Sequence, residues 1–576
     1  LFRSLQAPAA SEMLVEVETD GFSLYTVEFT YGSLQYVLPG DASVGLGDIL
    51  RTLGLTGDPT AVEVSSPELI GVTQESGSWT VTAKQAFSSQ EWMKVTIAGV
   101  TYEIVVTDDE GSGDSVAQIG ENKYATLAAA VNAASTGSPT IRLLKDVSLT
   151  ATQEITKSLT IDLNEHNITA TDARALWIKS GTVEIKGSGT ISTAKPASGT
   201  YGLADSSSVI RVGDTAASAA AKLTIGKDVT VSSNHCYGVT VFGKNSTANE
   251  LVVNGKVQVT GTASAISGNG SSGLSAANIT INNGATVTAT TDAGIYFPSA
   301  GKLTISGGAI SGPTGVYVKA GSLEVTGGTI TGTGGKADYT YNSNGLTATG
   351  DALVVDSCGY PSGAPTPDIS GGTFISKNAS AVASYVKDAS IAQVVNFIHG
   401  GIFSDNSDTT DEAVPDDKIL VQIPSGVNAG MYKLADAVKI TFDKNIGSGT
   451  DTVTQKVQKN VSTALDKNTF KNGDQKAFKA WNTASDGSGT SYADGESVLL
   501  DADLTLYAQW TEPVASVTTS GDPEVTTYYP SLAAAVAAAG ESDTVKLLAN
   551  VTESVTIPAE KSITLDLAGH NIRFFI

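Results

Sequence analysis

The sequence is poor in cysteine and in positive charge, and both shortages exclude classes of protein. Its 576 residues contain two cysteines, Cys236 and Cys358, which is too few for a disulfide framework. Charged residues make up 16%, and 59 acidic against 35 basic side chains give a net charge of −24. Such a surface repels nucleic acids and anionic membranes. We therefore expect neither nucleic acid nor a lipid surface as a partner.

Long apolar runs and metal-binding spacings are missing as well. No apolar run is long enough to cross a bilayer, so no membrane insertion is expected within this sequence. The acidic runs at 108–114 and 404–417 lack the regular Asp spacing of a calcium-binding loop. We interpret both runs as solvated linkers and expect no bound metal and no cofactor.

The residues that are abundant favour strands. Glycine occurs 60 times, and threonine, serine, valine and alanine are common. This mixture suits β-strands joined by tight turns better than it suits helices. The chain is also too long for one compact core. The prediction is a mainly β, elongated multidomain chain, and we expect it to be monomeric.

Residues 124–168 and 529–572 have nearly the same amino-acid sequence. Each copy begins with an alanine-rich stretch, LAAAVNAA or LAAAVAAA, that predicts a short helix. Alternating strands such as LTIDL follow. A β-solenoid needs a cap of this kind to cover its first coil, so the phrase indicates the start of a module. The chain has no initiating Met and ends inside the second copy, and we expect it to be a piece of a longer protein.

Apolar triplets that precede a Gly or Asn turn recur between the two copies. Most intervals between them fit one solenoid coil of roughly 20–30 residues. Two longer intervals predict excursions from the coil near 192–222 and 333–366. The triplets begin at Leu159, Val183, Leu223, Leu251, Ile279, Leu303, Leu323, Ile369 and Ile398.

These patterns divide the chain into six parts. A small β-rich domain with one helix at LGDILRTLGL comes first, then an acidic Gly/Ser linker, the capped solenoid, its exit segment, a block ending in LTLYAQW and a truncated second module. The predicted bounds are 1–107, 108–122, 123–405, 406–437, 438–513 and 514–576.

The block at 438–513 contains TFD at 441–443, AWNTASDGSGTSYADG at 480–495 and TLYAQW at 505–510. With these motifs it resembles the internalin B-type repeat, also called the Listeria–Bacteroides repeat. It departs from that pattern at NIGSGT and at Ala480, where the family usually has glycine. The resemblance implies a small β-grasp-like spacer in a secreted or cell-surface protein, of the Gram-positive cell-wall type.

The solenoid, with its DL-x-x-HNI starts, resembles right-handed parallel β-helices of the pectate-lyase-like superfamily. That superfamily includes lyases and hydrolases of acidic polysaccharides, whose chemistry needs a basic side chain or facing carboxylates. Between 142 and 437 the arginines are Arg142, Arg174 and Arg211, and the coils lack clustered carboxylates. HGG at 399–401 is similar to the His-Gly of polygalacturonase-type hydrolases, but this short match does not by itself indicate catalysis. We therefore predict no catalytic residue, and keep a polysaccharide lyase or hydrolase as the alternative.

Both module starts repeat the same three polar positions. A metal or catalytic role is conceivable for the histidines, but repetition in a turn favours a structural role through side-chain hydrogen bonds. The predicted turn residues are Asp162, His166 and Asn167 in the first copy and Asp566, His570 and Asn571 in the second.

The second excursion holds the best candidate for a ligand-binding site. Aromatic rings beside amide and carboxylate groups suit the recognition of sugars or proteins. The structural alternative is that the tyrosines only pack the excursion against the coil. The candidates are Tyr339, Tyr341, Asn342, Asp356 and Tyr360, with Tyr201, Asp205 and Arg211 of the first excursion as a second set.

Together these features predict a bacterial cell-surface adhesin or structural stalk. Its expected ligand is a glycan or a glycoprotein, bound on the β-helix. A pure spacer whose binding head lies outside this sequence is the remaining alternative.

Overall fold

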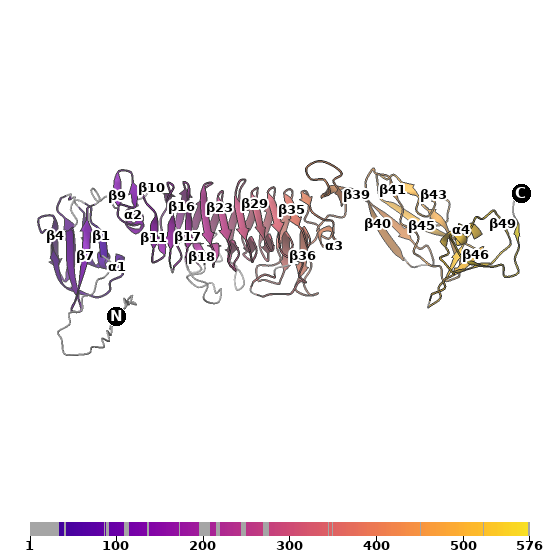
Figure 1. Ribbon diagram of the computed structural model, residues 1–576, viewed down its shortest axis with the longest axis horizontal. Helices are drawn as coiled ribbons and strands as arrows, with labels where there is room; N and C mark the ends of the chain where they lie inside the picture. The colour runs from indigo at the N-terminus through magenta and orange to yellow at the C-terminus, as the bar shows by residue number, and fades with distance from the viewer. Residues whose placement is uncertain are drawn as a thin grey trace. The chain divides into compact units, whose positions relative to one another are not determined.

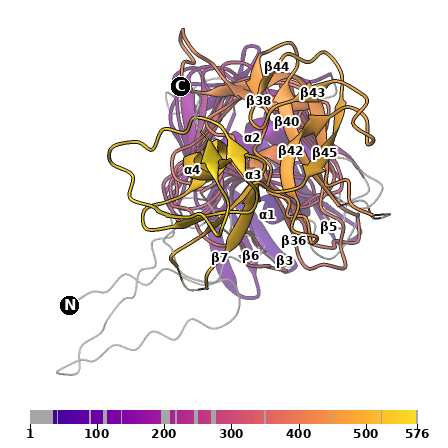
Figure 2. The same ribbon diagram turned by 90° about the vertical axis from the view of Figure 1, so that its right-hand side faces the viewer.

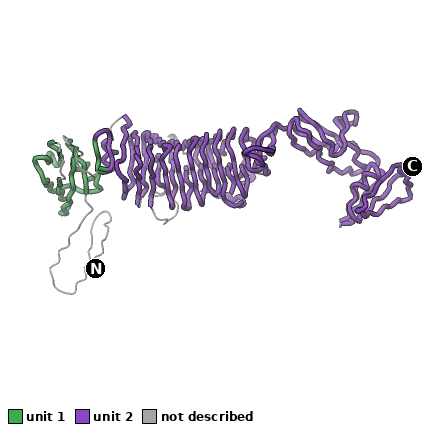
Figure 3. The backbone as a smooth tube through the Cα atoms, turned by 45° about the horizontal axis from the view of Figure 1, so that its top comes forward, with its two compact units in different colours: residues 1–115, 122–125 green, residues 116–121, 126–576 purple. Residues whose placement is uncertain are grey.

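The computed structural model forms two compact units, residues 1–115 with 122–125 and residues 116–121 with 126–576 (Figure 3). Predicted strands between 13 and 31, most of the acidic run at 108–114, Tyr201 and Asp205 lie outside the described residues. The structure describes residues 34–39, 42–85, 87, 91–108, 115–134, 137–171, 173–194, 208–214, 219–243, 249–268, 276–343, 345–347, 350–447, 449, 451–521 and 523–573.

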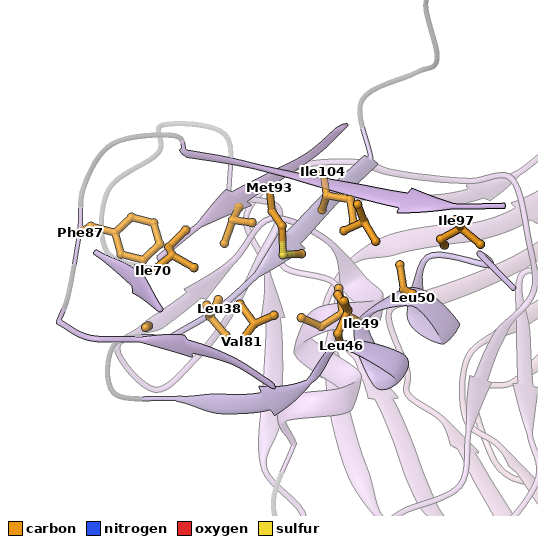
Figure 4. Close-up of a cluster of buried hydrophobic side chains, with 13 residues drawn as sticks. Leu38, Leu46, Ile49, Leu50, Ile70, Val81, Phe87, Met93, Ile97 and Ile104 are labelled. Atoms are coloured by element: carbon orange, nitrogen blue, oxygen red, sulfur yellow. The ribbon is translucent and has the colours of Figure 1, made fainter. Parts of the chain in front are cut away.

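The first unit contains two small sheets and one short helix. One sheet has the strand order β1-β7-β6-β3 and the other β2-β5-β4. Their alternating apolar side chains meet helix α1 in one core that includes Leu38, Ile49 and Met93 (Figure 4). The predicted helix is confirmed. The bounds are β1 Leu34–Val37, β2 Ser43–Gly45, α1 Leu46–Thr52, β3 Pro59–Val64, β4 Ile70–Glu75, β5 Ser78–Ala83, β6 Glu91–Ile97, β7 Val100–Thr107 and β9 Asn122–Tyr124.

Three long parallel sheets dominate the second unit. Every third strand of the chain joins the same sheet, so the backbone winds as a β-helix (Figure 1). Sheet I contains β10 Thr140–Leu143, β13 Leu159–Asp162, β16 Gly181–Lys186, β19 Ala221–Ile225, β22 Asn249–Val253, β25 Ala277–Ile281, β28 Lys302–Ile305, β31 Ser322–Val325 and β34 Thr366–Ile369. Sheet II contains β11 Val147–Leu149, β14 Ile168–Ala170, β17 Gly189–Thr193, β20 Val229–Ser233, β23 Lys256–Val259, β26 Thr286–Ala289, β29 Ala309–Gly312, β32 Thr329–Gly332, β35 Thr373–Ser376 and β37 Ile402–Phe403. Sheet III contains β12 Gln153–Ile155, β15 Leu176–Ile178, β18 Ser208–Val212, β21 Tyr237–Val241, β24 Ile266–Gly268, β27 Ile295–Phe297, β30 Val316–Val318, β33 Leu353–Ser357 and β36 Val382–Val386.

The first seven predicted triplet starts form one continuous ladder. Leu159 pairs with Val183, and the ladder continues through each start to Leu323, as predicted. The prediction is wrong by two residues at Ile369, since Leu323 pairs with Pro367 and Ile369 with Val325. Proline lacks an N–H, and β34 is the last strand of its sheet, where this donor is not needed.

The cap and the later parts of the second unit follow the expected order. Thr126 caps the N-terminus of helix α2 Leu127–Ala133, where its side chain accepts a hydrogen bond from the backbone N–H of Ala129. Strand β8 Ala117–Ile119 pairs antiparallel with β10. The second copy repeats this arrangement with α4 and with β46 against β48. The remaining bounds are α3 Asp408–Asp411, β38 Lys418–Gln422, α4 Leu532–Ala538, β46 Ala515–Thr518, β47 Thr526–Tyr529, β48 Thr544–Leu547, β49 Val551–Thr552, β50 Thr564–Asp566 and β51 Ile572–Arg573.

Between the β-helix and the second copy lies a smaller sheet built on β39. This strand pairs antiparallel with β40 and parallel with β45. Strand β45 in turn pairs with β42, and Figure 2 labels β40, β42 and β45. Their apolar faces enclose Trp481, which contacts the rings of Phe442 and Phe478. The bounds are β39 Tyr432–Asp443, β40 Thr452–Gln458, β41 Thr463–Ala464, β42 Ala477–Asn482, β43 Ser491–Tyr492, β44 Ser497–Val498 and β45 Leu504–Thr511.

Glycine pairs turn the corner between sheets I and II. Gly308 has a φ of +78°, and a Cβ there would lie 2.7 Å from the Ala285 carbonyl oxygen of the coil below. Gly284, at the same corner one coil earlier, has a φ of +87° but open space around it. At Gly308 both the positive φ and the lack of room for a Cβ require glycine, whereas at Gly284 only the positive φ does.

We predict that Gly308→Ala destabilises its coil more than Gly284→Ala does. Both substitutions place alanine at positive φ, but only the first adds a steric clash, which costs at least about 1 kcal/mol more. Hydrogen exchange followed by mass spectrometry in peptides covering β25 to β29 measures the difference. Equal loss of protection in the two variants would contradict this account of the corner.

Candidate functional site

From β18 to β33, sheet III differs from sheets I and II in having both of its faces almost entirely buried. Strands of sheet I, such as β19, alternate between buried and partly exposed residues, whereas every residue of β18 and β33 is buried. Tyr317 and Val354, which point away from the coil interior, are 1% and 0% exposed. Segments that connect the coils must therefore cover this face, and polar groups beneath them need partners within the protein.

A lysine and an aspartate lie on neighbouring coils beneath one such segment. Lys319 directly follows β30, and Asp356 belongs to β33, which pairs with β30 in parallel register. Both side chains are 0% exposed, and Lys319 Nζ lies 3.6 Å from Asp356 Oδ2. Nζ also donates hydrogen bonds to the carbonyl oxygens of Asn342, at 2.5 Å, and Gly345, at 2.7 Å. Lys319 thus fastens to the coil a segment made of residues 333–343, 345–347 and 350–352, called the covering loop below.

Tyrosines complete the buried group. The hydroxyl of Tyr339 donates to Asp356 Oδ1 at 2.8 Å, and that of Tyr317 donates to Oδ2 at 3.0 Å. The Tyr339 ring stacks on Tyr385 with 4.7 Å between centroids, and the Tyr385 hydroxyl donates to Asp351 Oδ2 at 3.0 Å. The carboxylates of Asp356 and Asp351 therefore both accept hydrogen bonds from tyrosine hydroxyls.

Two further tyrosine hydroxyls bind the backbone of the covering loop. Tyr360 donates to the Ser343 carbonyl oxygen and Tyr296 to that of Gly345, each at 3.2 Å. The Tyr360 ring also lies 5.2 Å from Lys319 Nζ. Loops are usually held weakly, but this one is bound through side chains of three successive coils, β27, β30 and β33.

Burial dominates the electrostatics of this group. Burial lowers the pKa of Lys319, and Asp356 opposes that shift. Burial also raises the pKa of Asp356, against the hydrogen bond from Tyr339 and the charge of Lys319. The pKa of Cys358 is raised to about 11, mainly by burial. This thiol is therefore protonated at neutral pH and unsuited to nucleophilic catalysis.

The structure brings together four of the five candidates from the second excursion. Tyr339, Asp356 and Tyr360 contribute side chains to the buried group, and Asn342 contributes its carbonyl. Tyr341 instead points to solvent, with 41% of its surface exposed and Lys387 Nζ 5.0 Å from its ring. Sequence reasoning missed the other members of the group, which are Tyr296, Tyr317, Lys319, Asp351 and Tyr385. A lysine directly after the apolar VYV run was the one visible signal.

Arg211 lies in a separate basic and aromatic group on the same sheet. Its guanidinium carbon is 4.7 Å from the Trp177 ring centroid and 4.3 Å from that of Phe242. Its Nη2 lies 3.5 Å from Asp214, and Lys179 also lies over the Trp177 ring, at 4.4 Å. Arg211 is 6% exposed, so its planar group packs between rings rather than reaching into solvent.

The predicted turn residues of the first module bind backbone groups. Asp162 Oδ1 accepts a hydrogen bond from the Asn164 amide at 3.1 Å, and Asn167 Oδ1 accepts one from the Thr190 amide of the next coil at 2.9 Å. His166 Nδ1 lies 3.6 Å from Asp146. These contacts close a turn and link it to its neighbour.

The second copy makes similar contacts. Asp566 Oδ1 accepts a hydrogen bond from the backbone N–H of Ala568 at 2.9 Å. The backbone N–H of Asn571 donates a hydrogen bond to Asn550 Oδ1 at 2.8 Å. The His570 amide donates to the Leu567 carbonyl at 2.8 Å, just as that of His166 donates to Leu163.

Metal-binding, disulfide and membrane features are absent from the described part of the chain. Its His, Cys, Asp and Glu side chains form no group of three or more that could hold a metal ion. Cys236 and Cys358 are both buried, and neither forms a disulfide. None of its helices is long and apolar enough to cross a membrane.

We predict that Tyr339→Phe loosens the covering loop, while Tyr341→Phe does not. The first substitution removes a hydrogen bond to a buried carboxylate, worth about 1.5 kcal/mol, and leaves the ring in place. Native-state proteolysis within 337–347 should become roughly tenfold faster. Unchanged cleavage in Tyr339→Phe would show that this hydroxyl does not hold the loop.

Comparison with known proteins identifies one segment of the chain. A model of the Listeria-Bacteroides repeat domain matches residues 439–509, in agreement with the predicted repeat, and this span runs from β39 to β45. No curated protein and no solved structure matches the chain. The likeness to pectate-lyase-like β-helices has no family match and stays a prediction. Residues 439–509 are therefore similar to a repeat that is typical of extracellular, surface-associated bacterial proteins.

Proposed function

We propose that this protein is a bacterial cell-surface adhesin and stalk that binds a glycan or glycoprotein on sheet III of its β-helix. The observation that carries the proposal is the covering loop, which a buried lysine, aspartate and tyrosine group fixes while Tyr341 stays exposed. The matched repeat supports a surface setting.

Tyr341 has the chemistry expected of a sugar platform. Its ring offers an apolar face to the C–H groups of a pyranose, and Lys387 and the exposed Asn342 supply polar groups beside it. The anchored loop presents the ring without much further ordering, which lowers the entropic cost of binding. The net charge of −24 favours a neutral glycan over an acidic one.

The role proposed here is binding rather than catalysis. A polysaccharide lyase or hydrolase needs an acid or base within reach of its substrate. Asp356 and Lys319 are fully buried, and both are committed to holding the loop. An accessible acid–base pair on the coil would instead favour the enzyme alternative, and release of sugar product in the binding experiment would reveal such an activity.

We predict that the full chain binds members of a panel of neutral glycans and mucins, and that Tyr341→Ala weakens this binding at least about tenfold, as the loss of a central aromatic contact does. Tyr528→Ala, which changes a partly exposed tyrosine on β47, serves as the matched control and should bind like the unmodified chain. Affinity is measured by surface plasmon resonance, and the release of reducing sugar ends, which hydrolases and lyases both cause, is followed in parallel on the same glycans and on an acidic polysaccharide.

Three results would contradict the proposal. Product formation would make the protein an enzyme. Unchanged binding in Tyr341→Ala would place the site away from the exposed ring of the covering loop. No binding across the panel would leave a spacer whose ligand-binding part lies elsewhere.

A further inference from the structure

The buried pair Lys319 and Asp356 has a geometry that a simple ion pair does not require. Among the ion pairs of the described residues, it is the one in which both side chains are 0% exposed. The parallel pairing of β30 with β33 holds the two residues at matching positions of neighbouring coils. Neither group can turn away to solvent, so the amine and the carboxyl group stay in contact for the lifetime of the fold.

The contacts of Lys319 can satisfy its amine in the charged form, which has three N–H groups, and also in the neutral form. Two backbone carbonyls, of Asn342 and Gly345, accept from Nζ, and the third neighbour is Asp356 Oδ2 at 3.6 Å. A neutral amine has two N–H groups and one lone pair. With both N–H groups on the carbonyls, the lone pair is directed toward the carboxyl group.

The surroundings of Asp356 suit an electrophile. Tyr339 donates to Oδ1 and Tyr317 to Oδ2, so each oxygen has a phenol donor. The donor on Oδ1 can stabilise negative charge that develops when the carboxyl carbon is attacked, and the donor on Oδ2 can assist the departure of that oxygen. Burial also disfavours the charged forms of both partners, which promotes proton transfer from the ammonium to the carboxylate.

We propose that Lys319 and Asp356 condense to an intramolecular amide cross-link between neighbouring coils. The ammonium first passes a proton to the carboxylate, giving an amine and a carboxylic acid. Nζ then forms a bond to Cγ of Asp356, and the bond from Cγ to Oδ2 breaks. Oδ2 leaves as water with its own proton and one proton from the nitrogen. No oxidant, reductant or metal is needed.

The cross-link would close a covalent ring across the covering loop. Such a ring restricts the unfolded chain in the way that a disulfide does, yet reducing agents do not open it. It would also let the coils on both sides of the loop resist a pulling force without separating there. This inference does not depend on glycan binding, because it concerns a bond inside the protein.

Mass spectrometry of the purified full chain, with its sequence unchanged, tests for the cross-link without any substitution. The intact mass is expected to be lower than the sequence mass by one water molecule. Trypsin should yield residues 303–336 joined to residues 337–377, with cleavage blocked at Lys319. Lys319→Arg, which keeps the positive charge but offers only a protonated guanidinium, should have the full sequence mass.

Two results would overturn the inference. One is the full sequence mass, with normal tryptic cleavage after Lys319, for the chain without substitutions. Lys319 and Asp356 would then be a buried ion pair only. The other is a missing water that peptide mapping places at other residues. Tyr339→Phe adds a graded test, since loss of the donor on Oδ1 should lower the cross-linked fraction.

Discussion

The parallel ladder between successive coils determines where every side chain of the β-helix lies. Each coil can pair with the next only if its inward apolar residues fall in the same register, as in the run from Leu159 to Leu323. A slip of one residue would turn that set toward solvent. Register therefore fixes the positions of all outward side chains as well, including Lys319 beside Asp356.

Differences between the three sheets follow from what lies on their outer faces. On sheets I and II the connecting turns are tight, and outward residues stay in contact with solvent. On sheet III the covering loop folds back over the strands, so polar groups beneath it must be satisfied internally. Lys319, Asp356 and the surrounding tyrosines meet this requirement and at the same time fix the covering loop. A segment without strands thus acquires the order that a binding surface needs.

Much of the fold could be predicted from the sequence, because alternation, glycine corners and the duplicated phrase are local signals. The error at Ile369 arose where Pro367 replaced the expected apolar residue at a sheet edge. The candidate site could be predicted only in part. Tyr339, Asp356 and Tyr360 stood out as an aromatic and polar cluster, whereas Lys319 resembled an ordinary exposed lysine after a strand. Its burial comes from Asn342 and Gly345, on a loop whose path periodicity cannot reveal.

Chemical labelling of the lysines shows whether the covering loop seals Lys319 beneath it. The native chain would be treated with an amine-reactive acetylating reagent, and modification of each lysine followed by mass spectrometry. Lys336, exposed on the same loop, and Lys387 serve as internal references. The account predicts that both are acetylated while Lys319 stays unmodified until the protein is denatured or, if the amide has formed, even afterwards. Acetylation of Lys319 in the native chain at the rate of Lys336 would contradict it.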